Sequence, residues 1–139
     1  MKKPFLIRLS YGIALFSLLT MNACKKDDDH DHSSSTDLDK PVITMSSPSD
    51  SMMYNNGDTM YIKGTVTDNS LHELLVTVID ANDSILYSQA PVVHDLTSYA
   101  IDMSWKTQVG NHTNASIIVV AEDHNANISS DTIHVHIMP

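Results

Sequence analysis

The sequence predicts an all-β fold, a seven-stranded antiparallel β-sandwich, within residues 40–139. Short runs of β-branched and apolar residues alternate with polar residues there, and clusters of Asn, Asp, Gly and Ser separate these runs. No segment has a long helical period of apolar residues. Seven short strands at this spacing are typical of a sandwich of two sheets.

Each predicted strand ends at a turn or loop. The strands cover residues 42–46, 59–67, 72–80, 85–89, 98–106, 115–122 and 129–138. Ser47-Pro48 ends the first, and Asn55–Asp58 and Ala81–Ser84 have turn composition. Residues 115–122 are almost continuously apolar, which predicts a central strand covered on both faces.

Alternation along the other strands assigns one face of each to the core, because successive side chains of a strand point to opposite sides. The residues expected on these faces are Met60, Ile62 and Val66; Leu74, Val76 and Val78; Tyr99, Ile101, Met103 and Trp105; and Ile133, Val135 and Ile137.

The first residues have the three-part layout of a secretory signal. Lys2, Lys3 and Arg8 give a positive start, residues 9–21 are mostly apolar, and Asn-Ala-Cys24 follows. The apolar run is shorter than the about 20 residues that a bilayer-spanning helix needs.

The short apolar run, the small residue and Cys24 resemble the lipobox of bacterial lipoproteins. This resemblance implies cleavage before Cys24, diacylation of its thiol and acylation of the new amine, as with palmitate. Two or more chains anchor a protein stably to a membrane. The alternative is an ordinary signal peptide with an incidental cysteine. Cys24 is the only cysteine, so the domain has no internal disulfide.

The sequence therefore predicts a signal peptide at 1–23, a lipidated cysteine and flexible acidic tether at 24–39, and one domain at 40–139. The tether has almost no apolar content to bury. An acidic run directly after the cysteine resembles the export tag of Bacteroidetes-type surface lipoproteins, which implies the outer face of the outer membrane. The alternative is the periplasmic face.

The charge balance argues against nucleic acid as a partner. The chain has a net charge of -9, and loss of residues 1–23 removes three basic and no acidic residues. Such an acidic surface repels nucleic acid and anionic lipid head groups.

A stretch near the end of the chain looks like the end of bacterial immunoglobulin-like (Ig-like) domains. Residues 119–129 give an apolar strand, Ala-x-Asp and a turn before the last strand, although Ala126 replaces the usual glycine. Pro41-Val42-Ile43 and Ser47-Pro48 resemble the way such domains begin. The resemblance covers residues 40–139 and implies a spacer, adhesin or ligand-binding module. The fold alone does not choose among these functions.

The sequence does not predict an enzyme. It contains no Gly-rich phosphate loop, no Gly-x-Ser-x-Gly elbow and no second cysteine. Ser, His and Asp are present, but in no recognisable catalytic order.

Histidine is the enriched chemical type, with eight residues, all after Cys24. Alternate loops of an Ig-like sandwich meet at one end, so loops 68–72, 90–97 and 123–128 should lie together. They carry His72, His94 and His124, and also Asp68, Asp95 and Asp123. Three imidazoles suit one Zn²⁺ or Cu²⁺, with a carboxylate or water completing the shell. The alternative is three unrelated exposed histidines.

Four of the five remaining histidines have two interpretations each. His134 and His136 should point outward from the last strand, as a weak metal site or as its polar face. His30 and His32 in the tether either hold an ion loosely or belong to a solvated export tag. His112 lies in a loop at the opposite end from the three-histidine loops and is expected to be solvated.

Two further features concern glycans. Tyr99 and Trp105 are core residues if buried and a platform for sugar rings if exposed. Asp-Ser/Thr followed by an apolar residue resembles the O-glycosylation signal of Bacteroidetes-type exported proteins. That resemblance implies the acceptors Ser51, Thr59, Ser84 and Thr132.

These observations together predict a lipid-anchored, non-enzymatic binding or structural module whose ligand is a protein, a glycan or a metal ion. The alternatives are a lipoprotein that binds Zn²⁺ or Cu²⁺ through His72, His94 and His124, and a carbohydrate-capture lipoprotein that uses exposed aromatic side chains.

Overall fold

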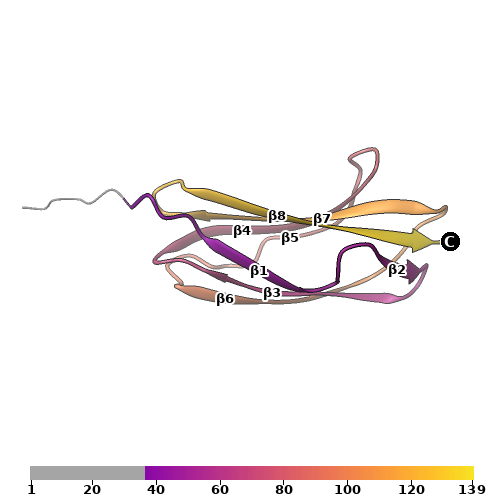
Figure 1. Cartoon of the computed structure of the whole chain (residues 1–139), viewed down its shortest axis with the longest axis horizontal. Helices are drawn as coiled ribbons and strands as arrows, with labels where there is room; N and C mark the ends of the chain where they lie inside the picture. Colours follow the sequence, from indigo (N-terminus) through magenta and orange to yellow (C-terminus); the bar gives the residue numbers. More distant parts are fainter. Residues whose placement is uncertain (1–36) are drawn as a thin grey trace, which may run out of the picture. The chain divides into compact units, whose positions relative to one another are not determined.

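The computed structural model describes residues 37–139, which form an all-β, Ig-like β-sandwich of eight strands in two sheets. Figure 1 shows the two sheets as layers that face each other. Cys24, His30 and His32 lie outside the described residues, so the signal peptide and the lipid anchor stay predictions. Among residues 37–139 no helix offers a segment able to cross a membrane.

The smaller sheet has the order β1-β3-β6 and the larger one the order β2-β8-β7-β4-β5. The strands are β1 (Val42–Ser47), β2 (Met52–Asn55), β3 (Thr59–Thr67), β4 (Leu71–Asp80), β5 (Ile85–Gln89), β6 (Ser98–Lys106), β7 (Thr113–Asp123) and β8 (Ile128–Met138). All neighbours are antiparallel except β2 and β8, which pair in parallel.

The seven predicted strands are confirmed, but the strand count is wrong by one. The structure adds β2, four residues that pair with the last strand of the chain. Its alternation is too short to identify from the sequence, and only Tyr54 of the four is buried. The pairing itself is non-local, since it joins residues 52–55 to residues 135–138.

The core lies between the sheets and matches the predicted faces of β3, β4, β6 and β8. Tyr99, Trp105 and Ile133 are partly buried at its margin. The expectation that both faces of β7 are covered is wrong, because Ile118 and Val120 on its outer face are partly exposed in the described part of the chain. β7 is apolar on both sides although only its inner side faces the core.

A glycine allows β1 and β3 to approach each other closely. A Cβ atom added at Gly64 would lie 2.7 Å from the carbonyl oxygen of Thr44 and 2.9 Å from Sδ of Met45. We expect Gly64→Ala to lower the free energy of unfolding by about 1–3 kcal/mol, because the backbone must shift to relieve this contact. Urea unfolding measures the change, with exposed Thr65→Ala as the control. Wild-type stability of Gly64→Ala would contradict this prediction.

Candidate metal centre

His72 is placed by an irregularity in the pairing of β4 with β7. Leu71 pairs with Asp123 and Glu73 pairs with Glu122, so His72 is an extra residue without a pairing partner. Such β-bulges bend a strand and re-aim a side chain. His72 was expected where loop 68–72 meets the strand at 72–80, and it lies in the second position of β4, where it is partly buried.

The loop between β5 and β6 brings His94 and Asp95 beside the bulge. The amide of Asp95 donates to the carbonyl of Leu71 (2.9 Å), and the amide of Leu71 donates to the carbonyl of Leu96 (2.9 Å). Asp95 has a φ of 63°, which Asp tolerates better than most residues. These two backbone hydrogen bonds fix the loop against the start of β4.

His124 comes from the turn between β7 and β8. The amide of His124 donates to the carbonyl of Ser70 at 3.2 Å, which holds the turn beside the start of β4. The turn is built on buried Asp123, whose Oδ1 accepts hydrogen bonds from the amides of Asn125 and Asn127, both at 2.8 Å. Burial raises the pKa of Asp123, but the hydrogen bonds from Asn127 and Asn125 outweigh it and hold the pKa below 3.8.

The three imidazole rings meet at this end of the sandwich. Ring centroids are 5.3 Å apart for His72 and His94, 4.7 Å for His72 and His124, and 4.5 Å for His94 and His124. One nitrogen from each ring can be chosen so that all three lie within 4.8 Å of one another. The predicted convergence of the three loops is therefore confirmed, while metal binding stays a prediction.

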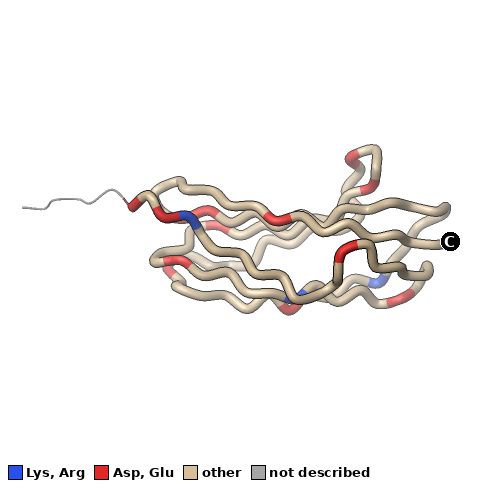
Figure 2. The backbone as a smooth tube through the Cα atoms, viewed as in Figure 1, with Lys and Arg blue, Asp and Glu red and all other residues tan. Residues whose placement is uncertain are grey.

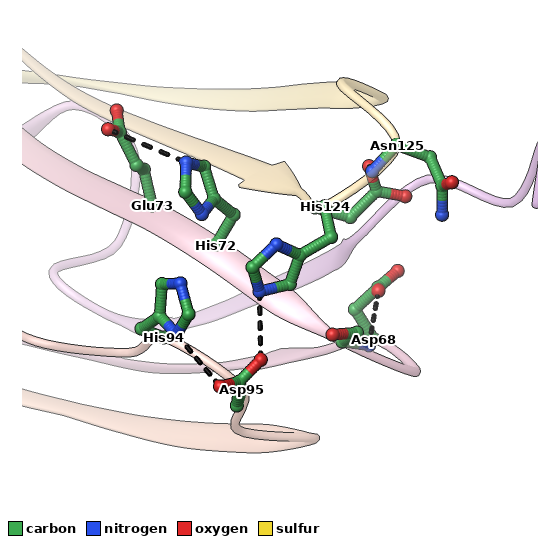
Figure 3. Close-up of polar contacts among 9 residues, drawn as sticks. Asp68, His72, Glu73, His94, Asp95, His124 and Asn125 are labelled. Carbon is green, nitrogen blue, oxygen red and sulfur yellow. Dashed lines mark hydrogen bonds and ion pairs between the residues drawn. The ribbon is translucent and has the colours of Figure 1, made fainter.

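Asp95 joins two of the rings. Its Oδ2 lies 2.9 Å from Nδ1 of His94, and its Oδ1 lies 2.9 Å from Nε2 of His124. An ionised carboxylate only accepts hydrogen bonds, so these two nitrogens carry the protons. In the neutral form of each ring, the form that binds a metal, the lone pairs are then on Nε2 of His94 and Nδ1 of His124, which in Figure 3 point toward the space between the rings.

Burial also raises the pKa of Asp95. The hydrogen bonds and charges of His94 and His124 outweigh this effect and bring the pKa below the ordinary aspartate value of 3.8. Asp95 is therefore ionised at neutral pH. A carboxylate that holds a metal-binding histidine in one tautomer is the usual outer-shell partner of such a ligand.

The third ring has a buried nitrogen without a protein partner. Nδ1 of His72 makes no hydrogen bond to any described residue, while Nε2 lies 4.0 Å from Oε1 of Glu73. In Figure 3 the Nε2 side faces Glu73 and the Nδ1 side faces the other two rings. Leaving a buried polar atom unsatisfied costs about 1–3 kcal/mol. A metal ion bound to Nδ1 would remove this cost.

The charge distribution around the rings favours a cation. Glu73, Asp95 and Glu122 lie on the elements that carry the three histidines. The described residues contain only three basic residues, Lys40, Lys63 and Lys106. Figure 2 shows acidic positions gathered near this end of the sandwich. Clefts with charges of one sign concentrate counter-ions.

The three aspartates predicted beside the histidines differ in role. Asp95 contacts two rings, as described above. Asp68 accepts the amide of Ser70 at 2.8 Å, and Asp123 stabilises its own turn. Asp95 therefore lies beside the rings as a hydrogen-bond partner of two of them, while Asp68 and Asp123 shape the loops. A carboxylate or water that completes the metal shell stays a prediction.

The other predicted sites do not join this cluster. His134 and His136 are on the outer side of β8, bonded to Ser116 Oγ (3.1 Å) and Asn114 Oδ1 (2.7 Å) respectively. His112 is exposed in the loop before β7. The four predicted glycosylation acceptors are all exposed: Ser51, Thr59, Ser84 and Thr132.

The aromatic residues favour a core role over a sugar platform. Trp105 is partly buried, packs against the core and stacks on Tyr87 with ring centroids 6.3 Å apart. Tyr99 also packs against the core.

We expect Asp95→Ala to weaken Zn²⁺ binding by about 10–100-fold, because two imidazoles lose the acceptor that fixes their tautomers. The free energy of unfolding should fall by about 1–2 kcal/mol, because alanine fits the positive φ of 63° less well than Asp does. The side chain itself is 72% exposed, so its loss leaves no cavity. Calorimetric titration and urea unfolding measure the two quantities. Asp102→Ala removes an equally exposed carboxylate, paired with Lys63, and is the control. Unchanged Zn²⁺ affinity in Asp95→Ala would contradict the prediction.

Asp123→Ala should lower the free energy of unfolding by about 1.5–3 kcal/mol at pH 7, since buried hydrogen bonds to a charged group are lost. The pKa of Asp123 is depressed in the folded state. Its contribution to the stability of the fold is therefore present above pH 3.8 and is lost as the pH falls through the folded-state pKa. Urea unfolding at several pH values should show the difference shrinking in acid. Glu122→Ala, on the outer face of β7, is the control. An equal cost at every pH would contradict the assignment.

No protein-family model and no curated protein match the chain. Among solved structures, the chain is similar to the crystal structure of an engineered protein, with a TM-score of 0.51 and 13% identity over 72% of this chain. It also resembles fibronectin(III)-like modules of Clostridium thermocellum CbhA, with a TM-score of 0.47 and 18% identity over 71% of this chain. The matches cover 20% and 47% of those chains, respectively. These similarities concern the fold alone.

Proposed function

We propose that this chain is a lipid-anchored, non-enzymatic binding module that takes up one divalent transition-metal ion, Zn²⁺ or Cu²⁺, through His72, His94 and His124. The observation that carries the proposal is the convergence of three imidazole nitrogens within 4.8 Å of one another, from three separate segments of the chain. Asp95 and the unpartnered Nδ1 of His72 support it independently.

The geometry is close to that of a bound site. Zn–N distances of about 2.0–2.1 Å place the nitrogens of a tetrahedral site about 3.3 Å apart. The nitrogens lie within 4.8 Å of one another, so the rings need to close by at most about 1.5 Å, which small side-chain rotations can supply. Three protein ligands leave a fourth position for water or an external donor. Imidazole suits both Zn²⁺ and Cu²⁺, and the general order of affinities favours Cu²⁺.

Titration of residues 34–139 with Zn²⁺ and Cu²⁺ tests the proposal, and this part of the chain is a compact unit with its own core. It also omits His30 and His32. We expect one ion per molecule with a micromolar or lower Kd, and loss of binding when His72, His94 and His124 are all replaced by alanine.

The matched control replaces the other three histidines of the domain, His112, His134 and His136, and should bind the ion as the wild type does. Millimolar affinity, or equal loss of affinity in both triple variants, would refute metal binding by the cluster.

Anchoring through Cys24 is the second part of the proposal and rests on the lipobox resemblance. In bacterial cells we expect the full chain in the membrane fraction with a mass increase from acyl chains, and Cys24→Ser in the soluble fraction. Digestion of intact cells by protease distinguishes the outer face of the outer membrane from the periplasmic face. A Cys24→Ser variant that stays acylated would refute lipidation at this residue.

A further inference from the structure

We infer that the fourth coordination position of the metal binds a small organic ligand, neutral or cationic. This ligand coordinates the metal through a nitrogen and places a hydrophobic group in the groove beside the histidines. This inference rests on the proposed metal site and names the class of molecule that site receives. It comes from a groove that shares two of its lining residues with the metal ligands.

The groove has a volume of about 390 Å³ and is lined by His72 and His94 together with mostly apolar side chains from β4, β7 and the loop after β5. Leu75 and Val92 are 43% and 88% exposed. Val120, on the neighbouring strand, pairs with Leu75 across the sheet and adds a third apolar side chain. Small-molecule sites are commonly clefts of about 300–1,000 Å³, lined by apolar side chains with a few polar groups.

The lining specifies the chemistry of the occupant. A metal held by three imidazoles needs one more donor. Two of the three imidazoles, those of His72 and His94, line the groove, so a ligand seated there lies beside the metal site. The apolar side chains offer a surface to a hydrophobic group, since burying apolar area is favourable. Glu73 and Glu122 also line the groove and disfavour an anionic ligand by charge repulsion.

The test compares imidazole with 4-phenylimidazole, which share one donor and differ in one hydrophobic ring. Zn²⁺ binding to residues 34–139 is measured first, and each probe is then titrated calorimetrically into the loaded and the metal-free domain. We expect 4-phenylimidazole to bind the loaded domain about tenfold more tightly than imidazole. That gain corresponds to roughly 55 Å² of the phenyl ring leaving water. The metal-free domain should bind neither probe measurably.

Leu75→Ser and Val92→Ser test the groove without disturbing the core, because both side chains are already exposed. Each should reduce the preference for 4-phenylimidazole while leaving Zn²⁺ and imidazole affinity unchanged. Ile85→Ser, an equally simple change at a 68% exposed position outside the groove lining, should leave the preference intact. Loss of the preference in all three variants alike would overturn the assignment to this groove.

The outcomes separate this inference from the proposed function. If the domain binds no Zn²⁺, both fail. If it binds Zn²⁺ but holds the two probes equally, only the inference fails. In the Co²⁺-loaded domain, 4-phenylimidazole should change the visible absorption of the ion. An unchanged spectrum would show that the probe does not reach the metal and would overturn the inference.

Discussion

Replacing His72 by alanine should weaken Zn²⁺ binding by about 100-fold or more. Loss of an outer-shell partner alone costs about 10–100-fold, and His72 is proposed as a direct ligand. Nδ1 of His72 is buried and has no hydrogen-bond partner among the described residues. Removing it therefore breaks no hydrogen bond within the protein. Competition titration against a chelator of known affinity measures the change.

The matched control is His134→Ala. His134 is an exposed histidine in β8, hydrogen-bonded to Ser116, and it lies outside the cluster. It should leave Zn²⁺ affinity within about twofold of the wild type, a difference of about 0.4 kcal/mol. If His72→Ala and His134→Ala behaved alike, binding would come from scattered surface histidines.

Ile117→Ala should lower the free energy of unfolding by about 2–5 kcal/mol. Ile117 is 0% exposed in β7, between β4 and β8, so truncation leaves a cavity in the core. Small domains have only about 5–15 kcal/mol of stability in total. The chain's one cysteine, Cys24, lies outside the domain, so no internal disulfide offsets the loss. Urea unfolding followed by tryptophan fluorescence, through Trp105, measures the difference.

Ile118→Ala is the control one position along the same strand. Its side chain points to the outer face and is already partly exposed, so we expect a loss of about 1 kcal/mol or less. Equal losses for Ile117→Ala and Ile118→Ala would contradict the assignment of the inner and outer faces of β7.

Much of the fold could be predicted because each long strand has its own alternation. The bounds of β3, β5 and β6 match the predicted ranges residue for residue. β2 could not be predicted, because its position depends on parallel pairing with β8 at the far end of the chain. The outer face of β7 was misjudged for a different reason: apolar Ile118 and Val120 do not report whether anything covers them.

The site was only partly predictable. The up-and-down order of strands was enough to bring the loops of His72, His94 and His124 together. The bulge at His72 was not, because it depends on the register between β4 and β7. The double contact of Asp95 depends on side-chain positions that no spacing reveals. The sequence signal for the apolar groove is a run of apolar residues in a loop directly before His94: Pro91, Val92 and Val93.

X-ray absorption at the zinc edge of residues 34–139 loaded with one equivalent of Zn²⁺ tests the three-histidine site most directly. The proposed site predicts three imidazole nitrogens at about 2.0 Å and one further light donor. It also predicts that the imidazole signal disappears in the variant without His72, His94 and His124. A shell of oxygen donors with no imidazole scattering, or an unchanged spectrum in that variant, would contradict it.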